Sequence, residues 1–193
     1  MKLDGILPFA RYLLEKTVKK GDIAVDGTVG NGHDTLFLAR LTGKTGRVFG
    51  FDIQEQAIAT TKRRLEENGE EEQVTLFHKG HEEILNSIPE KHHGKITGAV
   101  FNLGYLPGGD KSIVTRSETT IKAIEQLLKI MAPEGIIVLV IYHGHEEGAK
   151  ERDALLQYGK TLDQKKCHVL KYEFINQINN PPFIMAIEKR GEQ

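Results

Sequence analysis

The chain has 193 residues, of which 39% are hydrophobic, a formal net charge of −1 and a single cysteine, Cys167. This length and composition favour one globular domain over residues 1–193, and no apolar run reaches the ~20 residues of a membrane span. One cysteine excludes an internal disulfide and a multi-cysteine zinc site. The N-terminal residues lack the pattern of a signal peptide, so we expect a cytoplasmic protein without a membrane partner.

Strand-like and helix-like segments alternate along the chain. Strands are predicted at 22–26, 47–52, 73–78, 97–103, 135–142, 167–175 and 183–189, and helices at 9–19, 33–41, 54–68, 81–87, 115–131 and 146–160. Strands separated by helices predict a parallel, doubly wound α/β sheet with helices on both faces. The connection before 183–189 has no room for a helix, so the seventh strand should run antiparallel beside the sixth.

The most informative stretch is V-D-G-T-V-G-N-G-H-D-T at 25–35, between the first strand and the second helix. Glycine permits positive φ and a close backbone approach to a ligand, so this junction predicts a nucleotide-type pocket. The run begins with Asp26 and continues with Thr28, Gly30 and Gly32 at alternate positions. A carboxylate there repels a pyrophosphate but suits an ammonium group, which favours S-adenosylmethionine over a dinucleotide.

Polar residues also follow the next three strands, and ligands of open α/β sheets bind at the carboxyl ends of the strands. Asp52 ends the second strand, at about the spacing where an acidic residue accepts hydrogen bonds from ribose hydroxyls. His81 and Glu82 follow the third strand, where they can flank an adenine ring, and Asn102 ends the fourth. Four strand ends therefore converge on one predicted site.

Together, D-G-T-V-G-N-G-H-D-T, G-F-D-I-Q and N-L-G-Y-L-P-G-G-D-K resemble the class I S-adenosylmethionine-dependent methyltransferases over essentially the whole chain. Within that class the sequence resembles a small bacterial family labelled as rRNA methylases, whose members are tRNA 5-aminomethyl-2-thiouridine methyltransferases. The resemblance implies a Rossmann-like, seven-stranded, mostly parallel sheet, S-adenosyl-L-methionine as methyl donor, and a wobble uridine in the tRNA anticodon stem-loop as substrate. Thr28 departs from the superfamily pattern, because it replaces the first glycine.

The same resemblance assigns cofactor binding to particular positions. Asp52 holds the ribose, while Ile53 and Gln54 flank the adenosine with His81 and Glu82 nearby. The methionine moiety is lined by Asp26, Thr28, Gly30, Asn31, Gly32, His33, Asp34 and Thr35. We expect backbone N–H groups of the Gly30-Asn31-Gly32 turn, with the start of the next helix, to bind the methionine carboxylate.

Asn102 is the expected catalytic residue and also borders the cofactor. Its segment N-L-G-Y resembles the Asn/Asp-Pro-Pro-aromatic motif of exocyclic-amine methyltransferases, with Leu103 and Gly104 in place of the prolines. The Asn102 carbonyl can accept a hydrogen bond from the substrate amine and aim its lone pair at the methyl group. Tyr105 can stack on the uracil ring.

The substrate amine must lose a proton before it attacks, since an alkyl amine is mostly protonated at neutral pH. Asp110, Tyr142 and His143 are candidate proton acceptors, and a desolvated pocket that lowers the pKa of the amine is the alternative. His143-Gly144-His145 is followed by two glutamates, which we interpret as helix-entry residues that cap 146–160. No metal is expected.

RNA contact depends on local basic patches, because the chain as a whole is close to neutral. Three clusters can contact phosphates of the anticodon stem. They are Lys111 with Arg116; Arg11, Lys16, Lys19 and Lys20; and Lys160, Lys165, Lys166 and Lys171. A near-neutral chain that binds tRNA favours a homodimer.

Two other functions stay open at this point. One is a methyltransferase that acts on rRNA or on a small molecule, because the methylated atom depends on pocket shape. The other is a non-catalytic Rossmann module that binds a nucleotide, for which a preference for NAD over S-adenosylhomocysteine is the distinguishing observation.

Overall fold

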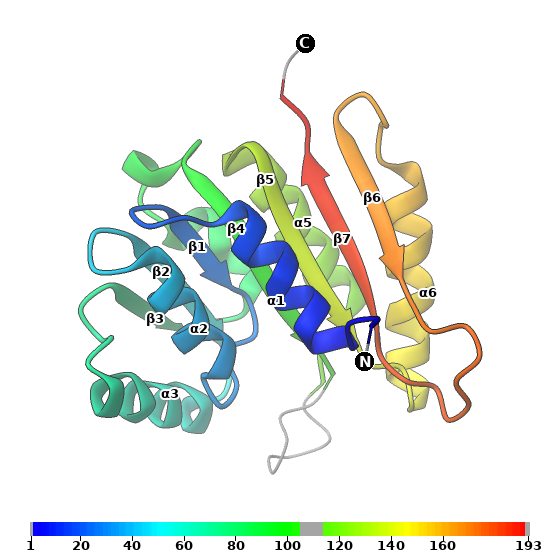
Figure 1. The fold of residues 1–193 in the computed structure, drawn as a ribbon, viewed down its shortest axis with the longest axis horizontal. Helices are drawn as coiled ribbons and strands as arrows, with labels where there is room; N and C mark the ends of the chain where they lie inside the picture. The colour runs from blue at the N-terminus through cyan, green and yellow to red at the C-terminus, as the bar shows by residue number, and fades with distance from the viewer. Residues whose placement is uncertain (1, 105–113, 192–193) are drawn as a thin grey trace.

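The computed structural model describes residues 2–104 and 114–191 (Figure 1). In these residues the strands are β1 Ile23–Asp26, β2 Arg47–Asp52, β3 Val74–His78, β4 Ile96–Leu103, β5 Met131–Ile141, β6 Cys167–Tyr172 and β7 Phe183–Lys189. The helices are α1 Ile6–Thr17, α2 His33–Thr42, α3 Glu55–Asn68, α4 Ile84–Ser87, α5 Ser117–Ile130 and α6 Glu146–Thr161, with short 3-10 turns η1 His81–Glu83 and η2 Glu90–His92. No helix in the described part of the chain is long and apolar enough to cross a membrane.

The strands form one sheet in the order β3-β2-β1-β4-β5-β7-β6. Strands β1 to β5 pair in parallel, and β7 is antiparallel to both of its neighbours, β5 and β6. The predicted fold class and the antiparallel seventh strand are confirmed. The sequence did not predict that β7 inserts between β5 and β6, so that it pairs with the fifth strand as well as the sixth.

Alternating side chains supply two separate cores, one on each face of the sheet. In β1, Ile23 and Val25 pack with residues of α4, α5 and α6, whereas Ala24 packs with residues of α1, α2 and α3. This follows from the two-residue period of a strand. Helices therefore cover both faces of the sheet (Figure 1).

The boundaries of some helices and strands differ from the predictions, because proline residues or pairing between strands determine where these elements begin and end. Helix α1 begins at Ile6 rather than at residue 9, because Pro8 is tolerated within a first turn whose N–H groups lack partners. Strand β6 ends at Tyr172, opposite Ile184, because Pro181 and Pro182 precede β7 and cannot donate to the ladder. The segment predicted as one helix at 81–87 is η1 followed by α4.

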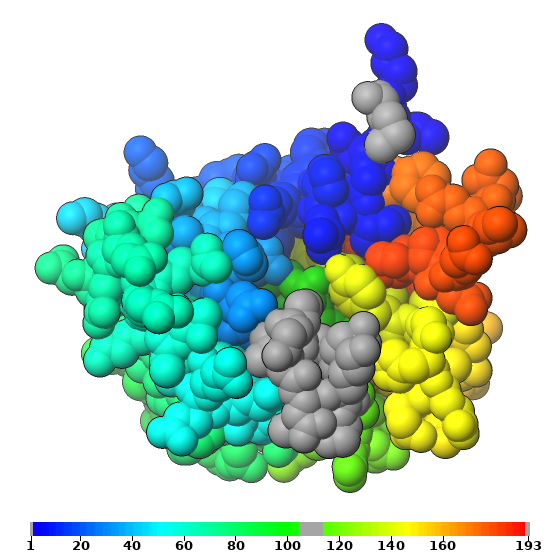
Figure 2. All heavy atoms as spheres, turned by 90° about the horizontal axis from the view of Figure 1, so that it is seen from below, coloured from blue at the N-terminus to red at the C-terminus, as the bar shows by residue number. Residues whose placement is uncertain are grey.

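The carboxyl ends of β1, β2 and β4 meet at one edge of the sheet, and β7 begins at the same edge. Figure 2 views the molecule from this side. Helix α1, in blue, and the connection between β6 and β7, in orange and red, border a recess on this face. Every predicted site residue that the structure describes lies at the carboxyl end of a strand or in the segment that follows it.

Candidate active site at the carboxyl edge of the sheet

Asp26 ends β1 and has no exposed surface. One carboxylate oxygen accepts from the Thr28 N–H at 3.1 Å and the other from the Thr35 hydroxyl at 2.6 Å. Burial, and secondarily the nearby charge of Asp34, raise the pKa of Asp26 to about 7. The carboxylate therefore braces the glycine loop from inside, which differs from the expectation that it faces the ammonium group of a ligand.

The glycine loop uses two of its N–H groups internally. Gly30 donates to Asp52 Oδ2 at 2.9 Å, and Gly32 donates to the Val29 carbonyl at 2.8 Å. The expectation that these two amides bind a carboxylate is therefore not met. Gly32 has a φ of 77°, and a Cβ there would lie 2.5 Å from Thr61 Oγ1. The amides that a helix leaves without an intrahelical acceptor come next, in the first turn of α2.

Helix α3 fastens the glycine loop from outside. The Thr61 hydroxyl donates to the Gly30 carbonyl at 3.2 Å, and Arg64 Nε donates to the Asn31 carbonyl at 2.7 Å. A second nitrogen of Arg64 lies 3.4 Å from His33 Nε2. Sequence reasoning missed Thr61 and Arg64. Their three-residue spacing on the helix that follows Asp52 is the signal that could have found them.

Asp52 ends β2 and joins the loop to α3. Besides the Gly30 amide, it accepts from the Gln54 N–H at 2.9 Å. Each carboxylate oxygen has a further lone pair for a ligand hydroxyl. Ile53 is 56% exposed beside it, and its carbonyl accepts from His78 Nε2 at 2.9 Å. The acid and the apolar side chain together suit a ribose and an adjoining flat ring.

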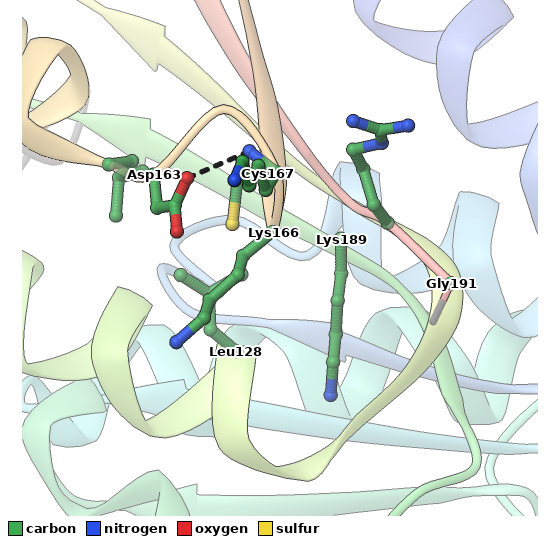
Figure 3. Close-up of a pocket in the computed structure, with 9 residues that line it drawn as sticks. Leu128, Asp163, Lys166, Cys167, Lys189 and Gly191 are labelled. Carbon is green, nitrogen blue, oxygen red and sulfur yellow. Dashed lines mark hydrogen bonds between the residues drawn. The ribbon is translucent and has the colours of Figure 1, made fainter. Parts of the chain in front are cut away.

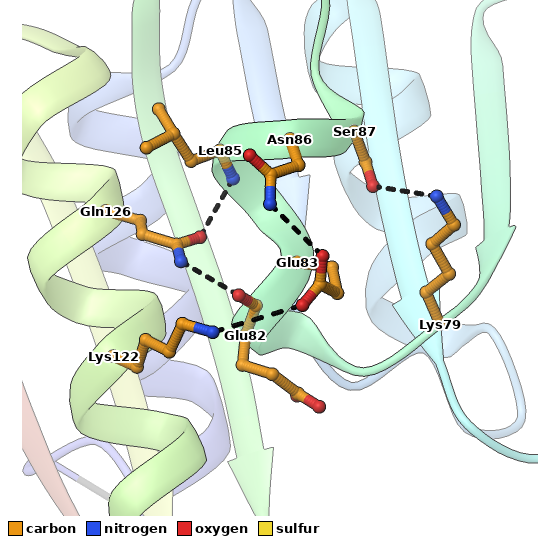
Figure 4. A network of polar contacts seen from close by, with 8 residues as sticks. All are labelled: Lys79, Glu82, Glu83, Leu85, Asn86, Ser87, Lys122 and Gln126. Atoms are coloured by element: carbon orange, nitrogen blue, oxygen red, sulfur yellow. Dashed lines mark hydrogen bonds and ion pairs between the residues drawn. The ribbon is translucent and has the colours of Figure 1, made fainter.

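His81 is buried rather than presented to a ligand. Its Nδ1–H donates to the Gly27 carbonyl at 3.0 Å, its ring meets the edge of Phe101, and burial lowers its pKa. It therefore supports the start of the glycine loop. Glu82 is anchored through its backbone, because Gln126 donates to the Glu82 carbonyl and accepts from the Leu85 N–H, both at 2.8 Å. Figure 4 shows the Glu82 carboxylate directed away from this contact.

Asn102 lies near the end of β4, against the cofactor side of the site. Its backbone N–H donates to the Thr28 hydroxyl at 2.7 Å, so the residue that replaces the superfamily glycine ties the loop to β4. Its side-chain Nδ2 donates to Asp34 Oδ2 at 2.5 Å, and Asp34 also pairs with Arg11 at 3.5 Å. Since a carboxylate only accepts, Asp34 fixes the amide so that Oδ1 is the acceptor of the Asn102 side chain.

The candidate proton acceptors are separated in space. Tyr105 and Asp110, with Lys111, lie outside the described residues. The Tyr142 N–H donates to the Leu103 carbonyl at 3.2 Å, but burial and the charge of Asp34 raise the pKa of its phenol, which disfavours a phenolate base.

His143 lies on the far side of this edge. Its ring centroid is 5.5 Å from that of Phe183, and its Nδ1 is 3.4 Å from a guanidinium nitrogen of Arg152. It therefore faces β7 and α6. His145 Nδ1 accepts from the Gly148 N–H at 3.0 Å at the start of α6, which confirms the predicted helix cap.

A separate hollow of about 670 Å³ lies at the opposite edge of the sheet, where β7 ends (Figure 3). Lys166, Cys167, Lys189 and Arg190 are among its lining residues. Lys189 donates to the Met131 carbonyl at 2.8 Å. None of the predicted catalytic or cofactor residues lines this hollow, so the carboxyl edge is the candidate site.

The family model described as "Putative rRNA methylase" matches residues 48–188. The chain belongs to this methylase family. A chloroplastic tRNA (mnm(5)s(2)U34)-methyltransferase of Arabidopsis thaliana is 34% identical over 190 residues, which cover 94% of this chain and 69% of the relative.

Two solved structures resemble this methylase over nearly its whole length. A "putative rRNA-methylase" from Clostridium thermocellum is 43% identical, with a TM-score of 0.94 over 98% of this chain and 100% of the other. A "putative methyltransferase" from Streptococcus mutans, solved in complex with SAH, is 38% identical, with a TM-score of 0.87 over 97% and 99%. The predicted family, its S-adenosylmethionine-dependent methyltransferase fold and its cofactor are thereby confirmed.

Proposed function

We propose that this methylase transfers a methyl group from S-adenosylmethionine to the aminomethyl nitrogen of 5-aminomethyl-2-thiouridine at the wobble position of tRNA. The observation that carries the proposal is the contact between Asn102 and Asp34, which leaves a fixed acceptor oxygen at the end of β4. The name of the Arabidopsis relative supports the choice of RNA and of position.

The residues at the ends of β1 and β2 fit the cofactor. Asp52 accepts hydrogen bonds from the ribose hydroxyls, and Ile53 covers the adenosine. The first-turn amides of α2, at His33 and Asp34, bind the methionine carboxylate in place of the amides of Gly30 and Gly32. When bound, the cofactor supplies a methyl group that its sulfonium already makes electrophilic.

The residues at the end of β4 fit a cationic amine. The Asp34 carboxylate attracts the ammonium form of the substrate. Oδ1 of Asn102 accepts an N–H from the amine and orients its lone pair, while desolvation favours release of the extra proton. Asp110 and His143 are the two residues that we propose as the acceptor of this proton.

An RNA partner is supported by exposed side chains around the recess at the carboxyl ends of the strands. Ile175 and Ile178, in the connection between β6 and β7, are 93% and 83% exposed, and that connection borders the recess of Figure 2. Arg11 lies on the other side of the recess, on α1, and is 47% exposed. Exposed apolar side chains and a cation on the two sides of one recess suit an unpaired base and its phosphate. The homodimer and the cytoplasmic location stay predictions, which light scattering and fractionation test.

The decisive experiment is mass spectrometry of tRNA nucleosides from a strain that lacks this gene. The strain should accumulate the unmethylated aminomethyl nucleoside, and purified protein with S-adenosylmethionine should convert it to the methylated form. Protein carrying Asn102→Ala is the matched control. An unchanged tRNA profile together with a methyl group lost from rRNA would replace the proposal with the rRNA activity that the family description suggests.

A further inference from the structure

A buried carboxylate that the proposed chemistry does not use lies between α6 and α5. Glu151, on α6, is 3% exposed. Its two oxygens accept from the hydroxyls of Thr115 at 2.5 Å and Thr120 at 2.9 Å. Burying a carboxylate costs stability, and a well-packed apolar side chain commonly serves a fold at least as well. Folding alone therefore does not explain why a glutamate occupies this position.

One branch from Glu151 ends at the glycine loop. The Thr120 oxygen, which is fully buried, lies 3.5 Å from His81 Nε2; because Thr120 donates its hydroxyl proton to Glu151 and His81 carries its proton on Nδ1, this is a packing contact and not a hydrogen bond. His81 donates through Nδ1 to the Gly27 carbonyl at 3.0 Å, and Gly27 opens the loop that follows Asp26. The Gly27 backbone is held on its other side by a hydrogen bond to the Val100 carbonyl at 2.9 Å. This branch thus reaches the cofactor half of the site through contacts between buried groups.

The other branch ends at β4. The Thr115 N–H donates to the Gly104 carbonyl at 3.1 Å, two residues beyond Asn102. The residue between them, Leu103, accepts from the Tyr142 N–H at 3.2 Å. Through Thr115, the Glu151 carboxylate therefore holds the strand end that carries Asn102.

We propose that Glu151 is a positioning residue for methyl transfer, which holds the cofactor loop and the Asn102 strand end in register through two threonine hydroxyls. The inference rests on the proposed function, which assigns one half of the site to the cofactor and the other half to the substrate amine. It predicts that each threonine serves one half of the site, whereas the carboxylate serves both.

The test compares Thr120→Val, Thr115→Val, Glu151→Leu and Glu151→Gln by calorimetry with S-adenosylhomocysteine and by methyl transfer to unmethylated tRNA. Thr120→Val should weaken S-adenosylhomocysteine binding about ten-fold, the effect expected for losing a hydrogen bond to a charged group. Thr115→Val should leave that affinity within about two-fold and lower kcat about ten-fold. Glu151→Leu should show both losses, and Glu151→Gln, which keeps polar partners for both hydroxyls, should recover most of each. Thr119→Val is the control, because the exposed Thr119 hydroxyl donates only to the Arg116 carbonyl at 2.9 Å.

Three outcomes overturn the inference. The first is that Thr120→Val and Thr115→Val change S-adenosylhomocysteine affinity and kcat in the same way, and the second is that Glu151→Leu keeps wild-type affinity and kcat. The third is that the losses in all variants simply follow a lowered melting temperature. If Glu151→Leu does not fold, the two valine variants still decide. Failure of the proposed function is distinguishable, because wild-type protein would then methylate no tRNA, while the calorimetric difference between Thr120→Val and Thr115→Val would still test the role of Glu151.

Discussion

The two halves of the active site are built in different ways. At the ends of β1 and β2, the loop and its acids are held by one another: Asp26 bonds Thr28 and Thr35, and Asp52 bonds the amides of Gly30 and Gln54. At the ends of β4 and β5, several side chains are exposed to solvent. Tyr142, after β5, is 38% exposed, and Ile175 and Ile178, in the connection after β6, are 93% and 83% exposed.

This difference matches the two kinds of ligand that the proposed function requires. A small cofactor of constant shape suits a site whose backbone is fixed before binding, since little ordering is then required on binding. A large partner suits a half that presents exposed side chains. The hydrogen bond between Asn102 and Asp34 joins the two halves, because it links β4 in one half to α2 in the other.

Asp52→Ala should have the largest effect, because it removes the ribose acceptor and also the acceptors of two loop amides. The affinity for S-adenosylhomocysteine, measured by calorimetry, should fall between about 100-fold and 1,000-fold. Asp163→Ala, at the opposite edge of the sheet, is the control. Affinity within a few-fold of wild type would show that the cofactor half does not depend on this acid.

Asn102→Ala should come next and should act mainly on the half that receives the amine. Losing the oriented acceptor should lower kcat about 100-fold with tRNA as substrate, while the affinity for S-adenosylhomocysteine changes little. Steady-state kinetics and calorimetry on the same preparation separate the two. Unchanged turnover would remove Asn102 from the catalytic machinery.

Asp34→Asn should have a smaller effect, which reports on the hydrogen bond between the two halves. An asparagine at position 34 can donate as well as accept, so it no longer fixes the orientation of the Asn102 amide. We expect kcat to fall about ten-fold. Lys122→Gln is the control, since its half-exposed pair with Glu83 contributes little. Equal losses in the two variants would contradict the orientation argument.

Asp26→Asn should have the smallest effect on activity and a clear effect on stability. Because the pKa of Asp26 rises from its ordinary 3.8 to about 7, the folded protein retains a proton that the unfolded chain releases between these values. The contribution of this group to the free energy of unfolding is therefore greatest below pH 4 and is lost as the pH rises toward 7. The wild-type minus variant difference should fall with a slope of at most roughly 1.4 kcal/mol per pH unit. Urea titrations across this range measure it, and a difference independent of pH would contradict the assignment.

Much of the fold was predictable because it is local in the sequence. Alternation of strands and helices predicted the parallel sheet. The acids predicted at the ends of the first two strands, Asp26 and Asp52, do end β1 and β2 in the structure, at the carboxyl ends of the strands. The place of β7 between β5 and β6 was not predictable from spacing, since it depends on pairing with a strand more than forty residues earlier along the chain.

The roles of individual site residues were harder to predict. The sequence does not show whether a carboxylate such as Asp26 faces a ligand or its own loop, because burial depends on Thr28 and Thr35 folding over it. In the sequence, the residue type of Glu151 does not distinguish it from the other charged residues of α6. The signal present was its helical spacing with Gly148, Leu155 and Gly159, which are all buried and mark one face of that helix.

The insertion of β7 has a consequence for biosynthesis. Within the described residues, strand β6 hydrogen-bonds to β7 alone, and β7 follows it along the chain. During translation from the N-terminus, β1 to β5 can pair as they emerge, but β6 must wait for the final strand to arrive. Sheet closure on this side therefore comes after β1 to β5 have emerged, and a ribosome that stalls before the codons for β7 leaves the edge of β5 open to pairing with another chain.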